Sequence, residues 1–258
     1  MPDFLSICVW LALTLARSTG FIVVWKSIRS QNSLRKLAGE TKDDDIINVE
    51  DLNEGLRLFR DYAKRGIKRF MENDLVGAVK DFDRAKAFNS TQPLLQRGMI
   101  LYLTGNYHDA AEQFYSDIIL LEKAKIYKMS DIRLWLSASY NKCGQMDEAI
   151  RALDLENYES HGIAEQRPLL NCTLLFYGQR LGLPDMMDMI GQSDNRDFLG
   201  LQFFGNFYLG LYYDSVGNAE LAKLFMDFPT SSTRYSKQDM WYHLPRRLST
   251  IRGWTDNP

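Results

Sequence analysis

Apolar side chains recur at helical spacing along the chain from about residue 58 to residue 228. In one such stretch, Val79 and Phe82 fall largely on one face of a helix, whereas Lys80 and Arg84 fall on the other. This spacing is typical of amphipathic helices that bury one face against their neighbours. The pattern therefore predicts an all-α fold.

The same small, aromatic and turn residues return at intervals of 32 to 39 residues. The recurring positions are Gly66, Asn73, Ala78 and Phe82 in a first copy, Gly98, Gly105, Ala110 and Phe114 in a second, Ser137, Tyr140, Gly144 and Ala149 in a third, and Gly210, Tyr213, Gly217 and Ala222 in a fifth. A degenerate fourth copy surrounds Gly182 and Met187. The small residues would let the first helix of a pair approach the second closely. One such pair cannot bury its apolar face alone, so at least three must stack.

This order of small, aromatic, glycine and alanine positions resembles the tetratricopeptide repeat family over roughly residues 58–228. The resemblance implies an irregular solenoid of about five helix pairs, followed by a capping helix near residues 235–252. The segments RGMILYLTGNYHDAAEQFYSDI and FYLGLYYDSVGNAELAKLF, with Trp241 and Trp254 near the C-terminus, look like poorly characterised organelle-directed repeat proteins of plants and algae. They are more distantly similar to the bacterial lipoprotein adaptor of the NlpI type. These resemblances imply a scaffold or adaptor role.

In the tetratricopeptide family, the first helices of successive pairs line a concave face on which partner peptides dock. The resemblance assigns to that face Lys64, Ile67, Phe70, Gln96, Met99, Tyr102, Trp135, Asn141 and Lys142. A face of this composition is apolar with scattered charge, and suits an amphipathic helix or an apolar strip of a partner protein. The alternative interpretation is that Phe70, Tyr102 and Trp135 are simply core between adjacent pairs.

The best-known members of the family bind the EEVD tails of chaperones through a carboxylate clamp of lysine, arginine and asparagine. At the matching positions this chain has Ala63 and Ile67 in the first copy, and Leu95 and Met99 in the second. Apolar side chains at these positions cannot hold a terminal carboxylate. A chaperone tail is therefore not the expected partner.

The N-terminus carries an apolar run, residues 4–16, that Arg17 separates from a second, shorter run, residues 21–25. The first run has the length of a signal-peptide core and is short for a membrane span. We interpret residues 1–20 as a signal peptide or anchor, and residues 21–55, basic and then acidic, as a transit segment or linker. The repeat domain then covers residues 56–252.

Two localisations follow from this N-terminus. The favoured one is entry into the secretory pathway or an organelle, with a plastid reached through a two-part leader. The alternative is an uncleaved anchor that associates with a membrane through residues 4–25 and leaves the repeats in the cytosol. If the chain passes through the endoplasmic reticulum, the Asn89-Ser90-Thr91 sequon would be a glycosylation site.

Composition narrows the function. Acids and bases nearly cancel at a formal net charge of -2, which argues against a general nucleic-acid binder. The three cysteines and three histidines show no metal-ligand spacing, and no phosphate-binding or nucleophile motif occurs. The sequence thus predicts no enzyme activity, cofactor or metal. It predicts a non-catalytic protein-binding adaptor, or alternatively a structural subunit permanently buried in a larger organelle or membrane complex.

Overall fold

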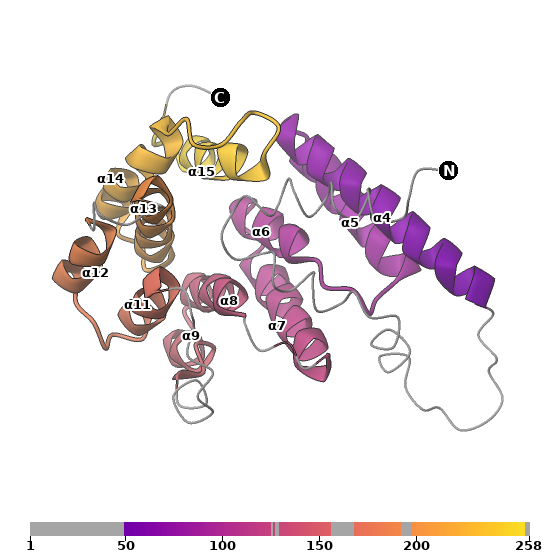
Figure 1. Ribbon diagram of the computed structural model, residues 1–258, viewed down its shortest axis with the longest axis horizontal. Helices are drawn as coiled ribbons and strands as arrows, with labels where there is room; N and C mark the ends of the chain where they lie inside the picture. Colours follow the sequence, from indigo (N-terminus) through magenta and orange to yellow (C-terminus); the bar gives the residue numbers. More distant parts are fainter. Residues whose placement is uncertain (1–48, 125, 127–128, 156–167, 192–197, 256–258) are drawn as a thin grey trace.

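The computed structural model describes residues 49–124, 126, 129–155, 168–191 and 198–255 (Figure 1). These residues form eleven α-helices, and no strand occurs among them. The helices are α4 (Val49–Met71), α5 (Leu75–Phe88), α6 (Leu95–Leu103), α7 (Tyr107–Lys123), α8 (Ser130–Lys142), α9 (Met146–Arg151), α11 (Pro168–Tyr177), α12 (Leu183–Ile190), α13 (Phe198–Ser215), α14 (Ala219–Ser231) and α15 (Met240–Ile251). The prediction of an all-α fold is therefore confirmed for this part of the chain.

The N-terminal segments predicted from the sequence fall almost entirely outside the described residues. The expected signal peptide or anchor, residues 1–20, and most of the expected linker, residues 21–55, belong there. Helix α4 begins at Val49 and so takes in the last part of that linker. The helical array starts earlier than residue 56, because the amphipathic pattern of α4 extends to its first turns.

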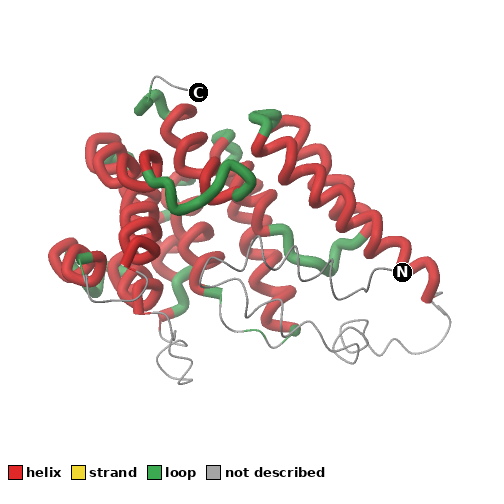
Figure 2. The backbone as a smooth tube through the Cα atoms, turned by 45° about the horizontal axis from the view of Figure 1, so that its top comes forward, coloured by secondary structure: helices red, strands yellow, loops and turns green. Residues whose placement is uncertain are grey.

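Helices that are neighbours in the sequence pack as pairs: α4 with α5, α6 with α7, α8 with α9, α11 with α12, and α13 with α14. The second helix of a pair also contacts the first helix of the next one, as in α5 with α6 and α7 with α8. Figure 2 shows the helices joined by short loops, many of which reverse the chain direction. Each helix thereby buries apolar side chains against its partner within the pair, and each pair buries more of them against the next pair.

The turn within a pair has the same geometry in four of the pairs. One residue lies in the left-handed region, namely Asn73, Gly105, Gly144 or Gly217, with φ of 70°, 83°, 74° and 81°. The next N–H then donates to the carbonyl five residues earlier, over 2.8 to 2.9 Å. This hydrogen bond satisfies a carbonyl at the helix end, and glycine or asparagine fits because the left-handed conformation costs these residues least.

The fourth pair keeps this turn but shifts it relative to the predicted phase. Gln179 is the left-handed residue there, with φ of 58°, and Gly182 instead precedes α12 with φ of -87°. Met186 is buried in the core, whereas Met187 is 43% exposed. The phase predicted around Gly182 and Met187 is therefore wrong, because a loop follows the turn before α12 begins.

Glycines of the first helices stand where the second helices come closest. A Cβ atom would lie 3.0 Å from the Phe82 ring at Gly66, and 2.5 Å from the Phe114 ring at Gly98. At Gly210 it would lie 2.7 Å from Cε of Met226. The second helices meet these positions with fully buried small or aromatic residues, which are Ala78, Phe82, Ala110, Phe114, Ala149 and Ala222. A small residue is favoured here because a larger side chain would press against the rings of the second helix, most of all at Gly98.

The array closes on itself, so that its two ends touch. Helix α8 contacts both α11 and α13, and α15 contacts α4 and α6 as well as α14. In Figure 1, α15 reaches from the α13–α14 pair toward the end of α4. Arg247 of α15 donates to the carbonyl of Met71 in α4 over 3.3 Å. The expected capping helix at residues 235–252 is α15, and it also joins the last pair to the first.

Candidate partner-binding face

The face predicted to bind partners is formed by the first helices α4, α6 and α8. Four of the nine side chains predicted to line it are buried: Phe70, Met99, Tyr102 and Trp135. The assignment of these four residues to an exposed surface is therefore wrong. Helix α8 contacts α6, α11 and α13, and α15 packs against α4 and α6, so the first helices do not line an open groove there. In this conformation these four residues belong to the core, as the alternative interpretation held for Phe70, Tyr102 and Trp135.

The other five predicted residues are only partly buried, but two of them are already engaged. Asn141 donates to Oγ of Ser215 over 3.2 Å, and the Lys142 ammonium lies 3.0 Å from Oδ1 of Asp214. Both contacts tie α8 to α13. The rest of the predicted face lies on α4 and α6 and has no such contact with α13. It consists of three partly exposed residues, Lys64, Ile67 and Gln96.

Aromatic rings join the first helices at the centre of the array. The Trp135 ring lies 5.4 Å from Tyr102, 6.0 Å from Phe114 and 5.9 Å from Phe207, measured between ring centroids. Phe207 in turn lies 5.7 Å from Trp241 of α15. Contacts at these separations add specific attraction to the burial of apolar area. Trp135 therefore links α6, α7, α8 and α13 into one core.

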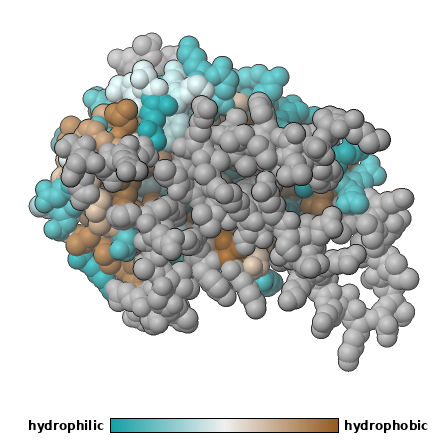
Figure 3. All heavy atoms as spheres, viewed as in Figure 1, coloured by the Kyte–Doolittle hydropathy of each residue, from teal (hydrophilic) through white to brown (hydrophobic). Residues whose placement is uncertain are grey.

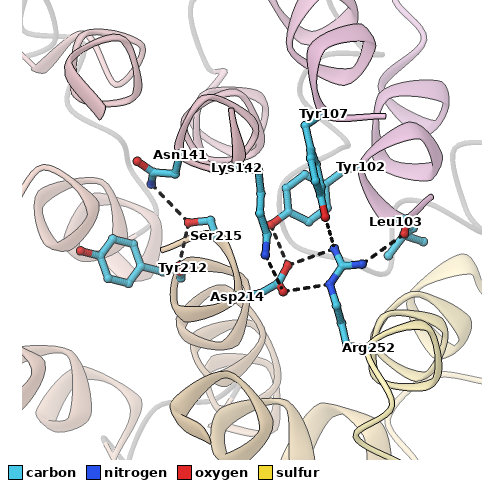
Figure 4. A network of polar contacts seen from close by, with 9 residues as sticks. All are labelled: Tyr102, Leu103, Tyr107, Asn141, Lys142, Tyr212, Asp214, Ser215 and Arg252. Atoms are coloured by element: carbon cyan, nitrogen blue, oxygen red, sulfur yellow. Dashed lines mark hydrogen bonds and ion pairs between the residues drawn. The ribbon is translucent and has the colours of Figure 1, made fainter. Parts of the chain in front are cut away.

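A polar cluster lies beside these rings, and we call Tyr102, Tyr107, Lys142, Asp214 and Arg252 the Asp214 cluster (Figure 4). The carboxylate of Asp214 accepts from Tyr102 (2.8 Å), from Lys142 (3.0 Å) and from Nε of Arg252 (2.9 Å). Arg252 also donates to the Tyr107 hydroxyl over 3.1 Å. Segments from α6, α8 and the end of α15 thus meet the buried carboxylate of α13, and Arg252 adds a contact to α7.

The Asp214 cluster has a net positive charge, because two cations surround one carboxylate. Burial raises the pKa of Tyr102 well above its ordinary value, and the neighbouring charge of Asp214 raises it further, so that this hydroxyl stays protonated and donates. Burial opposes the charge on Arg252, but the hydrogen bonds to Asp214 and the Asp214 charge together outweigh burial and raise the pKa of Arg252. Hydrogen bonds between charged groups are stronger than neutral ones. The cluster can therefore hold α13, α8 and the end of α15 together.

Asp214 was not among the residues predicted from the sequence. It is the only charged residue in the 18-residue helix α13, FLGLQFFGNFYLGLYYDS. A lone charge in an apolar helix is expected to have a partner, because an unpaired buried charge is costly. The sequence signal was present, but it does not say which of the distant cations is that partner.

Two buried carboxyls outside the Asp214 cluster, those of Asp81 and Asp117, differ in the partners that offset the cost of their burial. Asp81 accepts two hydrogen bonds of 2.6 Å from Arg65, which lower its pKa. Asp117 accepts only from the Leu94 N–H and the Gln113 amide, and its second oxygen has no hydrogen-bond partner among the described residues. Burial raises the pKa of Asp117 to about 7.

We expect Asp117 to make the free energy of unfolding fall as pH rises from about 4 to about 7. The native state holds the Asp117 proton over this range, whereas the unfolded chain has released it, so raising the pH favours unfolding by a few kcal/mol in order of magnitude. The Asp117→Asn variant lacks this titration. Urea unfolding across the range should therefore give a difference in stability, variant minus wild type, that increases with pH. A constant difference would contradict the raised pKa.

The sequon at Asn89 lies between the first two helix pairs, as predicted, in the loop after α5. Its Oδ1 atom accepts from the backbone N–H and the hydroxyl of Thr91, over 3.0 and 2.7 Å. These bonds order the loop through the side-chain oxygen, and the amide nitrogen makes no hydrogen bond to the part of the chain that the structure describes. Whether Asn89 is glycosylated stays a prediction.

Within the described part of the chain, no three His, Cys, Asp or Glu side chains are grouped so as to hold a metal ion. None of the helices described there combines the length and apolar character needed to cross a membrane. No protein-family model matches the chain, and a comparison with curated proteins also yields no match.

Proposed function

We propose that this chain is a non-catalytic protein-binding adaptor or scaffold built from tetratricopeptide-type helix pairs. The observation that carries the proposal is the recurrence of one turn and one glycine contact from pair to pair. Arrays of similar helix pairs commonly serve as binding surfaces, because the stacked units present long faces to a partner. The step from this architecture to a function is an analogy at the level of fold.

The end of the array nearest to α4 and α6 is the binding face that we favour. Lys64, Ile67 and Gln96 lie there with partial exposure and combine a cation, an apolar side chain and an amide. An amphipathic helix fits such a mixture, since its apolar side can cover Ile67 while its polar rim meets the other two residues. The expectation that a chaperone tail does not bind also stays part of the proposal.

Co-purification of the full-length protein from its native cell tests the adaptor function. We expect wild type to recover a reproducible partner protein, and the Ile67→Asp variant to recover roughly tenfold less, because a buried apolar contact is replaced by a charge. The matched control is Ile150→Asp, which makes the same change on α9 at a side chain that is 42% exposed. Equal recovery by both variants would contradict the proposed face, and no reproducible partner would contradict the adaptor function.

Exposed apolar side chains favour a second candidate, a structural subunit of a larger complex. Leu199 is 57% exposed, Leu224 63% and Tyr115 54%. Figure 3 shows apolar residues gathering over the C-terminal helix pairs on its left side. A permanent subunit should be insoluble without its complex, whereas an adaptor should be a soluble monomer or small oligomer. Sedimentation of the purified full-length chain separates the two candidates.

A further inference from the structure

We propose that α15 is an internal ligand of the array, and that a partner helix with the same pattern of side chains displaces it. The pattern is a tryptophan, two leucines and an arginine, as in Trp241, Leu244, Leu248 and Arg252. This inference rests on the proposed adaptor function, because it names the chemistry of the helix that the adaptor would receive.

The contacts of α15 are those of an amphipathic helix seated on a face. Trp241 packs edge-on against Phe204 and Phe207 of α13, at centroid distances of 5.0 and 5.7 Å. Leu244 and Leu248 are almost fully buried one and two turns later. Arg252 follows at the end of the helix and reaches Asp214. A helix docked through one apolar stripe is a recurrent way in which proteins bind peptides.

Two further polar contacts of α15 tie it to the first half of the array, while the Ser249 hydroxyl lies 3.2 Å from that of Thr230 in α14. Arg252 donates to the Leu103 carbonyl over 3.4 Å, and Arg247 donates to the Met71 carbonyl over 3.3 Å. These carbonyls lie at the ends of α6 and α4. Thus α15 bridges the first pairs and α13, which lie far apart along the chain.

The Asp214 cluster is built so that α15 can leave without stranding a charge. When Arg252 departs, Lys142 still lies 3.0 Å from the Asp214 carboxylate, and the Tyr102 hydroxyl still donates to it. The cluster then holds one cation and one anion, which is more balanced than the closed state. An unpaired buried charge would oppose opening, and none is left here.

Helix α15 also has an interruption in its backbone hydrogen bonds, as α14 has at Pro229. Pro245 lies inside α15 and removes one backbone donor from the helical hydrogen bonds. The segment from Ser232 to Asp239 precedes it without a helix, so α15 can swing away while α14 stays packed on α13. A helix attached in this way can open separately from the array.

A labelled peptide of residues 237–255 tests the displacement in trans on the full-length protein. The peptide must compete with the attached α15, so its apparent affinity is reduced by the fraction of open molecules. The Arg252→Met variant loses the contact to Asp214 and should bind the peptide roughly tenfold more tightly than wild type does. The exposed Arg151→Met variant should behave as wild type. A peptide with alanine in place of Trp241 and Leu248 should not bind either chain.

Hydrogen exchange gives a second readout. It is measured on the wild-type protein, so it does not require any variant to fold. Backbone amides of α15 should exchange at least about tenfold faster than those of α13, by local opening. Equal protection in α15 and α13 would show that α15 opens only with global unfolding and would overturn the proposal. Failure of the peptide to bind the Arg252→Met variant would overturn it too.

Three other outcomes assign the result to a different cause. If the Arg252→Met chain forms a dimer that excludes the peptide, the occupant is the α15 of a second copy, and the partner-helix proposal is overturned. If the peptide fails while wild type still captures its partner from the cell, the internal ligand is refuted and the adaptor function stands. If the peptide binds as expected while no partner is captured, the adaptor function is contradicted and the displacement of α15 stands.

Discussion

Replacing Asp214 with alanine is expected to lower the free energy of unfolding by about 3 kcal/mol. The substitution leaves Lys142 and Arg252, with side chains 18% and 16% exposed, facing each other without their shared carboxylate. It also leaves the buried Tyr102 hydroxyl without its acceptor. Partial access of water to the two cations keeps the loss below that of a fully buried pair. Urea unfolding of the full-length protein measures it.

Two further variants show whether charge or shape carries this effect. Asp214→Asn keeps an acceptor for Tyr102 but loses the negative charge, so we expect a smaller loss than for alanine. Adding Arg252→Met to Asp214→Ala removes one of the unpaired cations and should recover part of the lost stability. No recovery in the double variant would contradict an electrostatic role, and a negligible loss for Asp214→Asn would show that shape alone carries the effect.

The Trp135→Ala variant is expected to lose about 3 to 5 kcal/mol in its free energy of unfolding. Trp135 is fully buried, and it contacts rings from α6, α7 and α13. Because these rings lie on three helices that belong to two different pairs, they cannot move together to fill the space left by an indole. Calorimetry should show a lower melting temperature and retained helical content at room temperature.

The matched control is Trp135→Phe. The indole Nε1 atom of Trp135 is buried and has no hydrogen-bond partner among the described residues. A phenylalanine keeps most of the ring contacts and removes this unsatisfied donor, which offsets part of the lost area. We expect a clearly smaller loss than for alanine. A loss as large as that of Trp135→Ala would mean that the indole nitrogen is satisfied in solution.

The pairing of helices was readable from the sequence, because it depends on contacts between residues close along the chain. The types and spacing of Gly98 and Phe114 indicate a close approach between α6 and α7, and the left-handed turn at Gly105 falls between them. These signals are local and repeat. The shifted turn at Gln179 was missed because glutamine is an unusual left-handed residue, whereas the nearby Gly182 has the expected type and adopts another conformation.

The closure of the array was not readable, because it depends on residues far apart in the chain. Nothing in the local pattern places Arg252 beside Asp214, or α15 against α4. The same limit explains the candidate face. Tyr102 and Trp135 were correctly placed on first helices, but whether a first helix faces solvent or another helix depends on the curvature of the whole array. Their burial follows from that curvature.

The contact between Arg247 of α15 and Met71 of α4 has a consequence for synthesis on the ribosome. Helix α15 is the last described helix, so the ends can meet only after every helix pair has left the ribosomal tunnel. Domains generally fold from the N-terminus during synthesis, and early pairs such as α4–α5 can form while the later ones are still being made. For that interval the nascent chain is an open array whose inner aromatic residues are accessible to chaperones. Emergence of α15 from the tunnel then ends that exposure.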